Sequence, residues 1–176
     1  MASESRAAAI DSSHGRKPVA GLAEELMGHT YCSILVHVIF TTKDRRPLIS
    51  RAFRDRLHRY MAGVARHEFG SALAVGGTED HAHALLSVRA SVSTAEAVRK
   101  LKSLSSGWVH RTIPDALDFE WQPGYAAFSV SQSDAAVVRE YIESQAKHHE
   151  RRTFENELAR LLKGHGLSPV PGDQAG

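Results

Sequence analysis

Short apolar segments alternate along the chain with longer stretches in which apolar residues recur at helical spacing. Residues 31–42 read YCSILVHVIFTT, and their β-branched and aromatic side chains are typical of a buried strand. Residues 71–76 (SALAVG) and 81–89 (HAHALLSVR) are also predicted as strands, and the GTED sequence between them indicates a hairpin. We expect residues 119–130 to form a fourth strand, interrupted by a Pro-Gly pair.

Helical patterns follow the first, third and fourth of these strands. Residues 48–67 repeat apolar positions every three or four residues and carry basic side chains on the opposite face, which predicts an amphipathic helix. Ser93 and Glu96 have the spacing of a capping box and predict the start of a second helix. A third helix is expected from Ser133 to about His149, and a final helix is expected to be capped by Thr153.

The predicted order is strand, helix, strand, strand, helix, strand, followed by helices. This is the split β-α-β arrangement, a ferredoxin-like (RRM-like) α+β fold in which a four-stranded antiparallel sheet carries helices on one face. We expect residues 29–166 to form this single domain, with flexible tails at 1–28 and 167–176. Met27 lies just before the first segment with an ordered pattern and is an alternative start to Met1.

Length and composition are those of one globular domain. The 176 residues, of which 42% are hydrophobic, are enough to bury a core without metal or disulfide support. Cys32 is the single cysteine, so an intramolecular disulfide is excluded and a reducing compartment, the cytoplasm, is expected. No apolar run approaches the about 20 residues that a membrane-spanning helix needs, and no membrane partner is expected.

The formal net charge is only +2, but the basic residues are clustered. Residues 43–59 contain seven basic side chains and two acidic ones, which favours a polyanionic partner over an ordinary solvated surface. The candidate phosphate contacts in this cluster and near the motifs described below are Lys43, Arg45, Arg46, Arg54, Lys100, Lys102, Lys147, Arg151 and Arg152.

The sequence EDHAHALLSV contains a His-x-His pair, His81 and His83. Because alternate residues of a strand point to the same side, both imidazoles are expected on one face, close enough to bind one divalent metal. Two surface histidines at the start of a strand are the alternative that this spacing alone leaves open. His37 lies inside the first predicted strand and is taken as structural.

A second pair of polar residues lies on the third predicted helix. Tyr141 and Gln145 are four residues apart and therefore share one helical face. A tyrosine and a carboxamide in this arrangement fit the roles of nucleophile and metal ligand. The alternative is a tyrosine that packs at the edge of the core beside a solvated glutamine.

Taken in order, these segments resemble the single-tyrosine HUH transposases, and especially the small REP-associated tyrosine transposases. The resemblance extends from about Gly28 to Gly166. The segments that carry it are HTYCSILVHVIFTTKDRRPLI, GGTEDHAHALLSV, VRKLKSLSSGWVH and FEWQPGYAAFSVSQSDAAVVREYIESQAKHH, with its Tyr-Ile-x-x-Gln core. The residue between the two histidines is Ala82, which is small but still apolar, as the family motif requires.

The resemblance implies a role for each matched residue. Tyr141 is implied as the nucleophile, and His81, His83 and Gln145 as ligands of a divalent metal, Mg²⁺ or Mn²⁺. The implied reaction is in-line attack on single-stranded, hairpin-associated DNA, which leaves a 5′-phosphotyrosine and a free 3′-hydroxyl. The phosphodiester bond energy is retained, so no nucleotide cofactor is needed. The family also implies a homodimer acting on two DNA ends.

Two other functions fit parts of the sequence. A domesticated DNA-binding regulator would keep the fold and bind hairpins without transposing them. A metal-dependent phosphodiester hydrolase would use His81 and His83 with water as the nucleophile, but it leaves the Tyr141–Gln145 spacing unexplained. The recognised DNA, the cleavage position, the metal, and whether the tyrosine helix serves its own subunit or a partner stay open at this stage.

Overall fold

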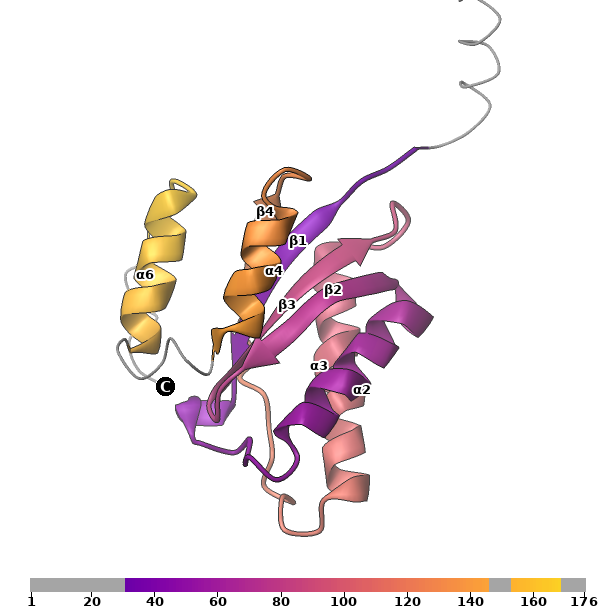
Figure 1. Cartoon of the computed structure of the whole chain (residues 1–176). Helices are drawn as coiled ribbons and strands as arrows, with labels where there is room; N and C mark the ends of the chain where they lie inside the picture. Colours follow the sequence, from indigo (N-terminus) through magenta and orange to yellow (C-terminus); the bar gives the residue numbers. More distant parts are fainter. Residues whose placement is uncertain (1–30, 146–152, 169–176) are drawn as a thin grey trace, which may run out of the picture. The chain divides into compact units, whose positions relative to one another are not determined.

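The computed structural model of the chain describes residues 31–145 and 153–168. Its centre is a four-stranded antiparallel sheet with strand order β2-β3-β1-β4 (Figure 1). The four strands are β1 (Leu35–Thr41), β2 (Gly70–Gly77), β3 (His81–Val88) and β4 (Ala126–Val130). The ferredoxin-like α+β fold is therefore confirmed, and β1 and β3 are its two central strands.

Helices cover both faces of this sheet. One face carries α2 (Arg54–Glu68) and α3 (Thr94–Thr112), and the other carries α4 (Ala135–Glu143) against β2 and β3 (Figure 1). The last described helix is α6 (Phe154–Gly164), and a short 3-10 helix, η1 (Lys43–Arg45), follows β1. No helix in the described ranges is long and apolar enough to cross a membrane.

Strand alternation divides the buried side chains between two hydrophobic clusters. Leu86 of β3 belongs to the larger cluster, between the sheet and the helices α2 and α3. Its neighbour Leu85 faces the other way and packs with Ile142 of α4 in a smaller cluster. His81 and His83 have the parity of Leu85, so they lie on the face that α4 covers.

Two helix starts agree with the capping residues identified in the sequence. The Ser93 hydroxyl accepts a hydrogen bond from the Glu96 backbone amide at the start of α3. The Thr153 hydroxyl accepts one from the Asn156 amide at the start of α6. The third predicted helix corresponds to α4 as far as Glu143, with Ser144 as its C-cap; the predicted continuation over residues 146–149 lies outside the described part.

The first predicted helix begins later than its periodicity indicated. It was expected from residue 48, but α2 starts at Arg54, after Phe53 in a non-helical conformation. The preceding segment is fixed by a 2.9 Å hydrogen bond from the Ile49 amide to the Glu79 carbonyl, and the Ile49 side chain is fully buried. Because Ile49 is buried from a bend that precedes the helix, tertiary packing here overrides the helical pattern.

The fourth predicted strand is also shorter than expected. Only Ala126–Val130 pairs along β1, while Trp121 makes an isolated bridge to Thr42. Pro123 cannot donate to a strand ladder, which explains the interruption. The carbonyls of residues 122–124 accept hydrogen bonds from the ammonium group of Lys102 instead.

The first predicted strand is likewise trimmed, from 31–42 to the seven residues of β1. The predicted N-terminal tail at 1–28 and residues 169–176 of the predicted C-terminal tail lie outside the described residues.

Candidate metal and nucleophile site

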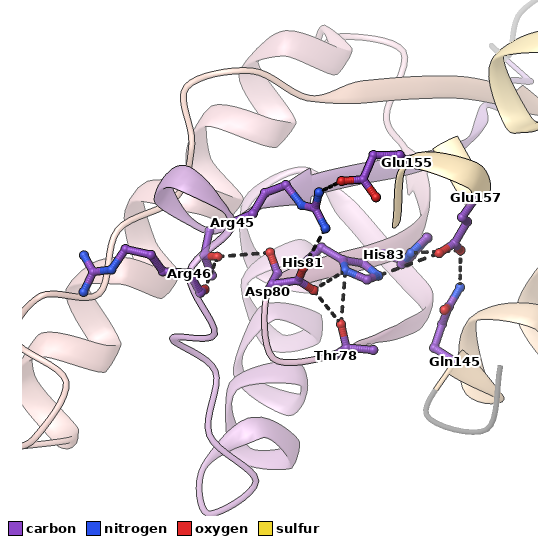
Figure 2. Close-up of polar contacts among 10 residues, drawn as sticks. Arg45, Arg46, Thr78, Asp80, His81, His83, Gln145, Glu155 and Glu157 are labelled. Atoms are coloured by element: carbon purple, nitrogen blue, oxygen red, sulfur yellow. Dashed lines mark hydrogen bonds and ion pairs between the residues drawn. The ribbon is translucent and has the colours of Figure 1, made fainter. Parts of the chain in front are cut away.

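Three buried side chains meet on the α4 face of the sheet (Figure 2). They are His81 and His83 of β3, both completely buried, and Glu157 of α6, which is 6% exposed. Nε2 of His83 lies 3.4 Å from Oε1 of Glu157, and Nε2 of His81 lies 4.0 Å from Oε2. One ligand atom from each residue lies within 4.8 Å of the others, as a site for a single cation requires.

Glu157 was not identified from the sequence. In the helix sequence FENELARLLKG, it lies three residues after Phe154 and four before Leu161, on the apolar face. A carboxylate on the buried face of an amphipathic helix is unusual, because burying a charge is costly unless it is compensated. An acidic residue on this apolar face was therefore the signal in the sequence that could have identified Glu157 as a candidate site residue.

The outer nitrogen of His81 is held by a carboxylate. Nδ1 of His81 lies 2.7 Å from Oδ1 of Asp80, which also accepts a hydrogen bond from the Thr78 hydroxyl, while Arg45 contacts Oδ2 at 3.3 Å. Burial alone would raise the pKa of Asp80, but the contacts with His81, Thr78 and Arg45 outweigh it and hold the pKa well below its usual range. Asp80 therefore remains an acceptor, and Nδ1–H of His81 donates to it, which leaves Nε2 facing Glu157.

The outer nitrogen of His83 is held by another histidine. Nδ1 of His83 lies 3.0 Å from Nε2 of His37, a buried residue of β1. Burial lowers the pKa of His37 to about 4, so the ring is neutral near pH 7. His37, taken as structural from the sequence, thus bonds to a candidate ligand and orients its Nε2 atom toward Glu157.

Tyr141, on α4, and Gln145, just after its C-cap Ser144, reach the same carboxylate. The Tyr141 hydroxyl and the Gln145 Nε2 group, the latter at 2.8 Å, both donate to Oε1 of Glu157. Burial, followed by the contact with Glu157, raises the pKa of Tyr141 to about 12, so its phenol is neutral near pH 7. The helical spacing of the two residues therefore brings them to one point.

The amide oxygen of Gln145 tests whether these residues fit a metal. Gln145 is 1% exposed, and its Oε1 atom makes no hydrogen bond to any residue that the structure describes. An acceptor of this kind is costly to bury, and a cation would satisfy it. Two imidazole nitrogens, a carboxylate and an amide oxygen are suitable ligands for Mn²⁺ and related divalent ions.

The start of α6 packs over His81. The ring of Phe154 lies 4.9 Å from the His81 ring, and the Arg45 guanidinium lies 5.0 Å above Phe154. Arg45 also forms an ion pair with Glu155, and it bonds to Asp80 on its other side (Figure 2). Arg45 therefore connects α6 to the outer hydrogen bonds of His81.

A glycine of β2 allows α4 to approach the sheet closely. A Cβ atom on Gly76 would lie 2.3 Å from the carbonyl oxygen of Ile142, which follows Tyr141 in the chain. Any side chain at this position would push the helix outward. The position of the Tyr141 hydroxyl therefore depends on the absence of a side chain at Gly76.

Most of the predicted phosphate contacts have acidic or carbonyl partners within the protein. The pairs are Lys43 with Glu120, Arg45 with Asp80 and Glu155, Arg46 with Asp118, and Lys100 with Glu68 and Glu96, while Lys102 binds backbone carbonyls. Arg54 makes no ion pair within the described residues. The other three candidates, Lys147, Arg151 and Arg152, lie outside those residues. All nine stay predictions.

This fold and site define the class of single-tyrosine HUH transposases. Residues 30–145 match the family described as transposase IS200-like, Y1_Tnp, and the chain belongs to this family. The resemblance identified from the sequence is thereby confirmed, and with it the assignment to the transposases, enzymes of DNA transposition.

Individual relatives are distant. The chain is 25% identical over 123 residues to the ISDra2 transposase TnpA of Deinococcus radiodurans. This alignment covers 67% of this chain and 87% of the relative. The crystal structure of a protein from Deinococcus radiodurans described as a transposase superposes with a TM-score of 0.53 at 24% sequence identity. The match covers 67% of this chain and 94% of that one. A REP-associated tyrosine transposase bound to a REP hairpin has a TM-score of 0.52 at 18% identity, covering 84% and 89%. The two solved structures support the fold.

Proposed function

We propose that this transposase cleaves and rejoins single-stranded DNA beside a hairpin, with Tyr141 as the nucleophile. The observation that carries the proposal is the meeting of Tyr141, Gln145, His81 and His83 around one buried point. A tyrosine alone or a histidine pair alone would have an ordinary structural explanation. A nucleophile beside candidate metal ligands is what phosphoryl transfer through a covalent intermediate requires.

The reaction exchanges one phosphodiester bond for another. The Tyr141 oxygen forms a bond to phosphorus as the bond from phosphorus to the 3′ oxygen breaks, which leaves DNA attached through its 5′ phosphate. The phenol loses its proton, and the leaving oxygen gains one as the 3′-hydroxyl. Because the pKa of Tyr141 is raised to about 12, its proton must be accepted during the attack rather than beforehand. Attack by a 3′-hydroxyl on the phosphotyrosine reverses the step and rejoins DNA.

His81, His83 and Gln145 would hold the divalent metal, Mg²⁺ or Mn²⁺. Nε2 of each histidine faces the site, and the Gln145 amide oxygen has no hydrogen-bond partner among the described residues. When bound, the metal supplies a positive charge that stabilises the scissile phosphate in its transition state. The residues themselves orient the nucleophile and keep the site largely closed to water, since both histidines are fully buried.

Hairpin DNA is the proposed substrate. The structural neighbour bound to a REP hairpin supports it, together with the basic cluster at residues 43–59. Arg54 forms no ion pair among the described residues and would contact a phosphate without losing a carboxylate partner, whereas Arg45 and Arg46 would exchange a carboxylate for a phosphate. A homodimer, which would hold two DNA ends, is also proposed; light scattering on the purified protein tests it.

A denaturing gel tests the reaction. The full-length protein is incubated with a labelled single-stranded hairpin and Mn²⁺, and a covalent adduct is expected for the wild type but not for Tyr141→Phe. Tyr60→Phe, on α2 behind the sheet, is the matched control and should form the adduct. His81→Ala and His83→Ala should lose cleavage more than DNA binding.

The same gel separates the competing functions. Cleavage without an adduct that persists in Tyr141→Phe would identify a hydrolase that uses water. Binding without cleavage, with Tyr141 intact, would favour a regulator that no longer transposes. Either result would contradict the proposed function.

A further inference from the structure

We propose that Glu157 is itself a ligand of the divalent metal, so that α6 completes the site with a carboxylate. The inference rests on the proposed function only in assuming that a metal binds between His81 and His83. Glu157 lies beyond residues 30–145, the part of the chain that matches the family. The carboxylate is thus an addition to the two histidines and Gln145, contributed by a separate helix.

The distances to the two imidazoles match a shared cation. Bonds from a metal to nitrogen or oxygen are about 2.0–2.2 Å long, so two ligands of one ion lie no more than about 4.4 Å apart. Oε1 of Glu157 is 3.4 Å from Nε2 of His83, and Oε2 is 4.0 Å from Nε2 of His81. Glu157 presents one oxygen to each histidine (Figure 2).

The imidazoles are oriented for the same cation. Asp80 bonds to Nδ1 of His81, and His37 bonds to Nδ1 of His83. In each ring Nδ1 is taken up by this outer contact, so Nε2 is the atom that faces Glu157 and that a cation would use. Two imidazole nitrogens and a carboxylate therefore face one point, and this set of ligands suits a divalent cation.

Burial gives a second, independent reason. Glu157 is 6% exposed and accepts hydrogen bonds from the Tyr141 hydroxyl and the Gln145 amide group. A carboxylate is costly to bury, and a divalent cation bound to it would offset that cost. The buried amide oxygen of Gln145, without a hydrogen-bond partner among the described residues, adds another acceptor beside it. One divalent ion would satisfy both residues.

Anchoring of α6 does not account for Glu157. The helix start is held by the Thr153 cap, by Phe154 against His81, and by the ion pair of Glu155 with Arg45. An apolar residue at position 157 would pack on this face without the cost of a buried charge. Metal binding explains why position 157 carries a carboxylate, whereas packing of α6 alone would favour an apolar residue such as leucine.

Metal binding by the full-length protein without DNA tests the proposal. Mn²⁺ is titrated into the wild type, Glu157→Gln and Glu157→Leu, and free Mn²⁺ is followed by electron paramagnetic resonance. Both variants should bind Mn²⁺ at least tenfold more weakly. Glu157→Leu is included because an apolar side chain of similar volume is well tolerated in place of a buried charge, and thermal unfolding of each variant confirms the fold.

Glu155→Gln is the matched control, because it makes the same chemical change on the same helical turn, at a side chain that is 62% exposed. Its Mn²⁺ affinity should stay within twofold of the wild type. Unchanged affinity in Glu157→Gln and Glu157→Leu would overturn the proposal. An equal loss in Glu155→Gln would also overturn it, since the effect would then come from docking of α6.

The two proposals fail separately. If the wild type binds Mn²⁺ through Glu157 but forms no adduct with hairpin DNA, the ligand assignment stands and the proposed function is wrong. If adduct formation depends on Tyr141 while the Glu157 variants bind Mn²⁺ normally and cleave DNA faster, Glu157 obstructs the site and is no ligand.

Discussion

Nε2 of His37 lies 3.0 Å from Nδ1 of His83, so a histidine of β1 supports a candidate metal ligand of β3. The two residues are 46 positions apart in the chain and meet because β1 and β3 are paired as central strands. The neutral imidazole of His37 holds Nδ1 of His83, as the Asp80 carboxylate holds Nδ1 of His81. The two ligands are therefore held by outer partners of different charge, one anionic and one neutral.

Replacing His37 with phenylalanine should weaken metal binding without unfolding the protein. The ring volume is retained, but the hydrogen-bond partner that orients His83 is lost, and loss of such a partner typically costs about 10–100-fold in metal affinity. Mn²⁺ titration measures the change. His67→Phe, at a side chain that is 87% exposed, is the control and should bind as the wild type does. Wild-type affinity in His37→Phe would show that the hydrogen bond does not position the ligand.

A methyl group at position 76 should displace the nucleophile helix. Gly76→Ala would place Cβ 2.3 Å from the Ile142 carbonyl, and such overpacking costs about 1–3 kcal/mol of unfolding free energy. Adduct formation should fall with it, because Tyr141 precedes Ile142. Urea unfolding and the denaturing gel measure the two effects.

Gly63→Ala provides the matched control for that substitution. Gly63 lies inside α2, and a Cβ there meets no atom within 4 Å. The change should stabilise the protein by about 0.5–1 kcal/mol, because alanine is the better helix former. Equal effects of the two substitutions would contradict the close contact between β2 and α4.

Divalent metal should raise the stability of the folded protein. A ligand at 100 times its dissociation constant adds about 2.7 kcal/mol to the free energy of unfolding, provided that it binds only the folded state. Thermal unfolding with and without Mn²⁺ should therefore show a higher midpoint for the wild type, reversed by EDTA. His83→Ala should show no shift. A shift of the same size in that variant would place the bound ion elsewhere.

Mild acid should destabilise the protein through His58. Burial, followed by the charge of Arg54, lowers the pKa of this residue from 6.5 to about 4. Below pH 6.5 the unfolded chain therefore binds a proton that the folded protein does not accept. Stability falls as the pH drops from 6.5 toward 4, by at most about 2 kcal/mol at pH 5.

Urea unfolding at pH 7.5 and pH 5 measures that loss. His58→Gln should lose less stability between the two values than the wild type, because glutamine does not titrate. The comparison between the two proteins cancels the contributions of other histidines. An equal loss in both would assign the acid sensitivity to a different group.

Patterns with short periods were interpreted correctly from the sequence. The alternation of β3 brings His81 and His83 to one face. The four-residue spacing of Tyr141, on α4, and Gln145, just after its C-cap, brings both side chains to Glu157. Element lengths were less accurate where burial competes with periodicity. Ile49 is buried in a bend where a helix was predicted. Trp121 is buried in a loop, with an isolated bridge to Thr42, where a strand was predicted.

By itself, the sequence determined the order of elements, the ferredoxin-like fold, the family, and the two pairs of residues offered to the site. Each of these depends on neighbours a few positions apart, where backbone geometry alone sets which side chains share a face. Only the tertiary structure decided that His37 and Glu157 join them. Their contacts depend on the pairing of β1 with β3 and on the docking of α6, and no local period encodes either.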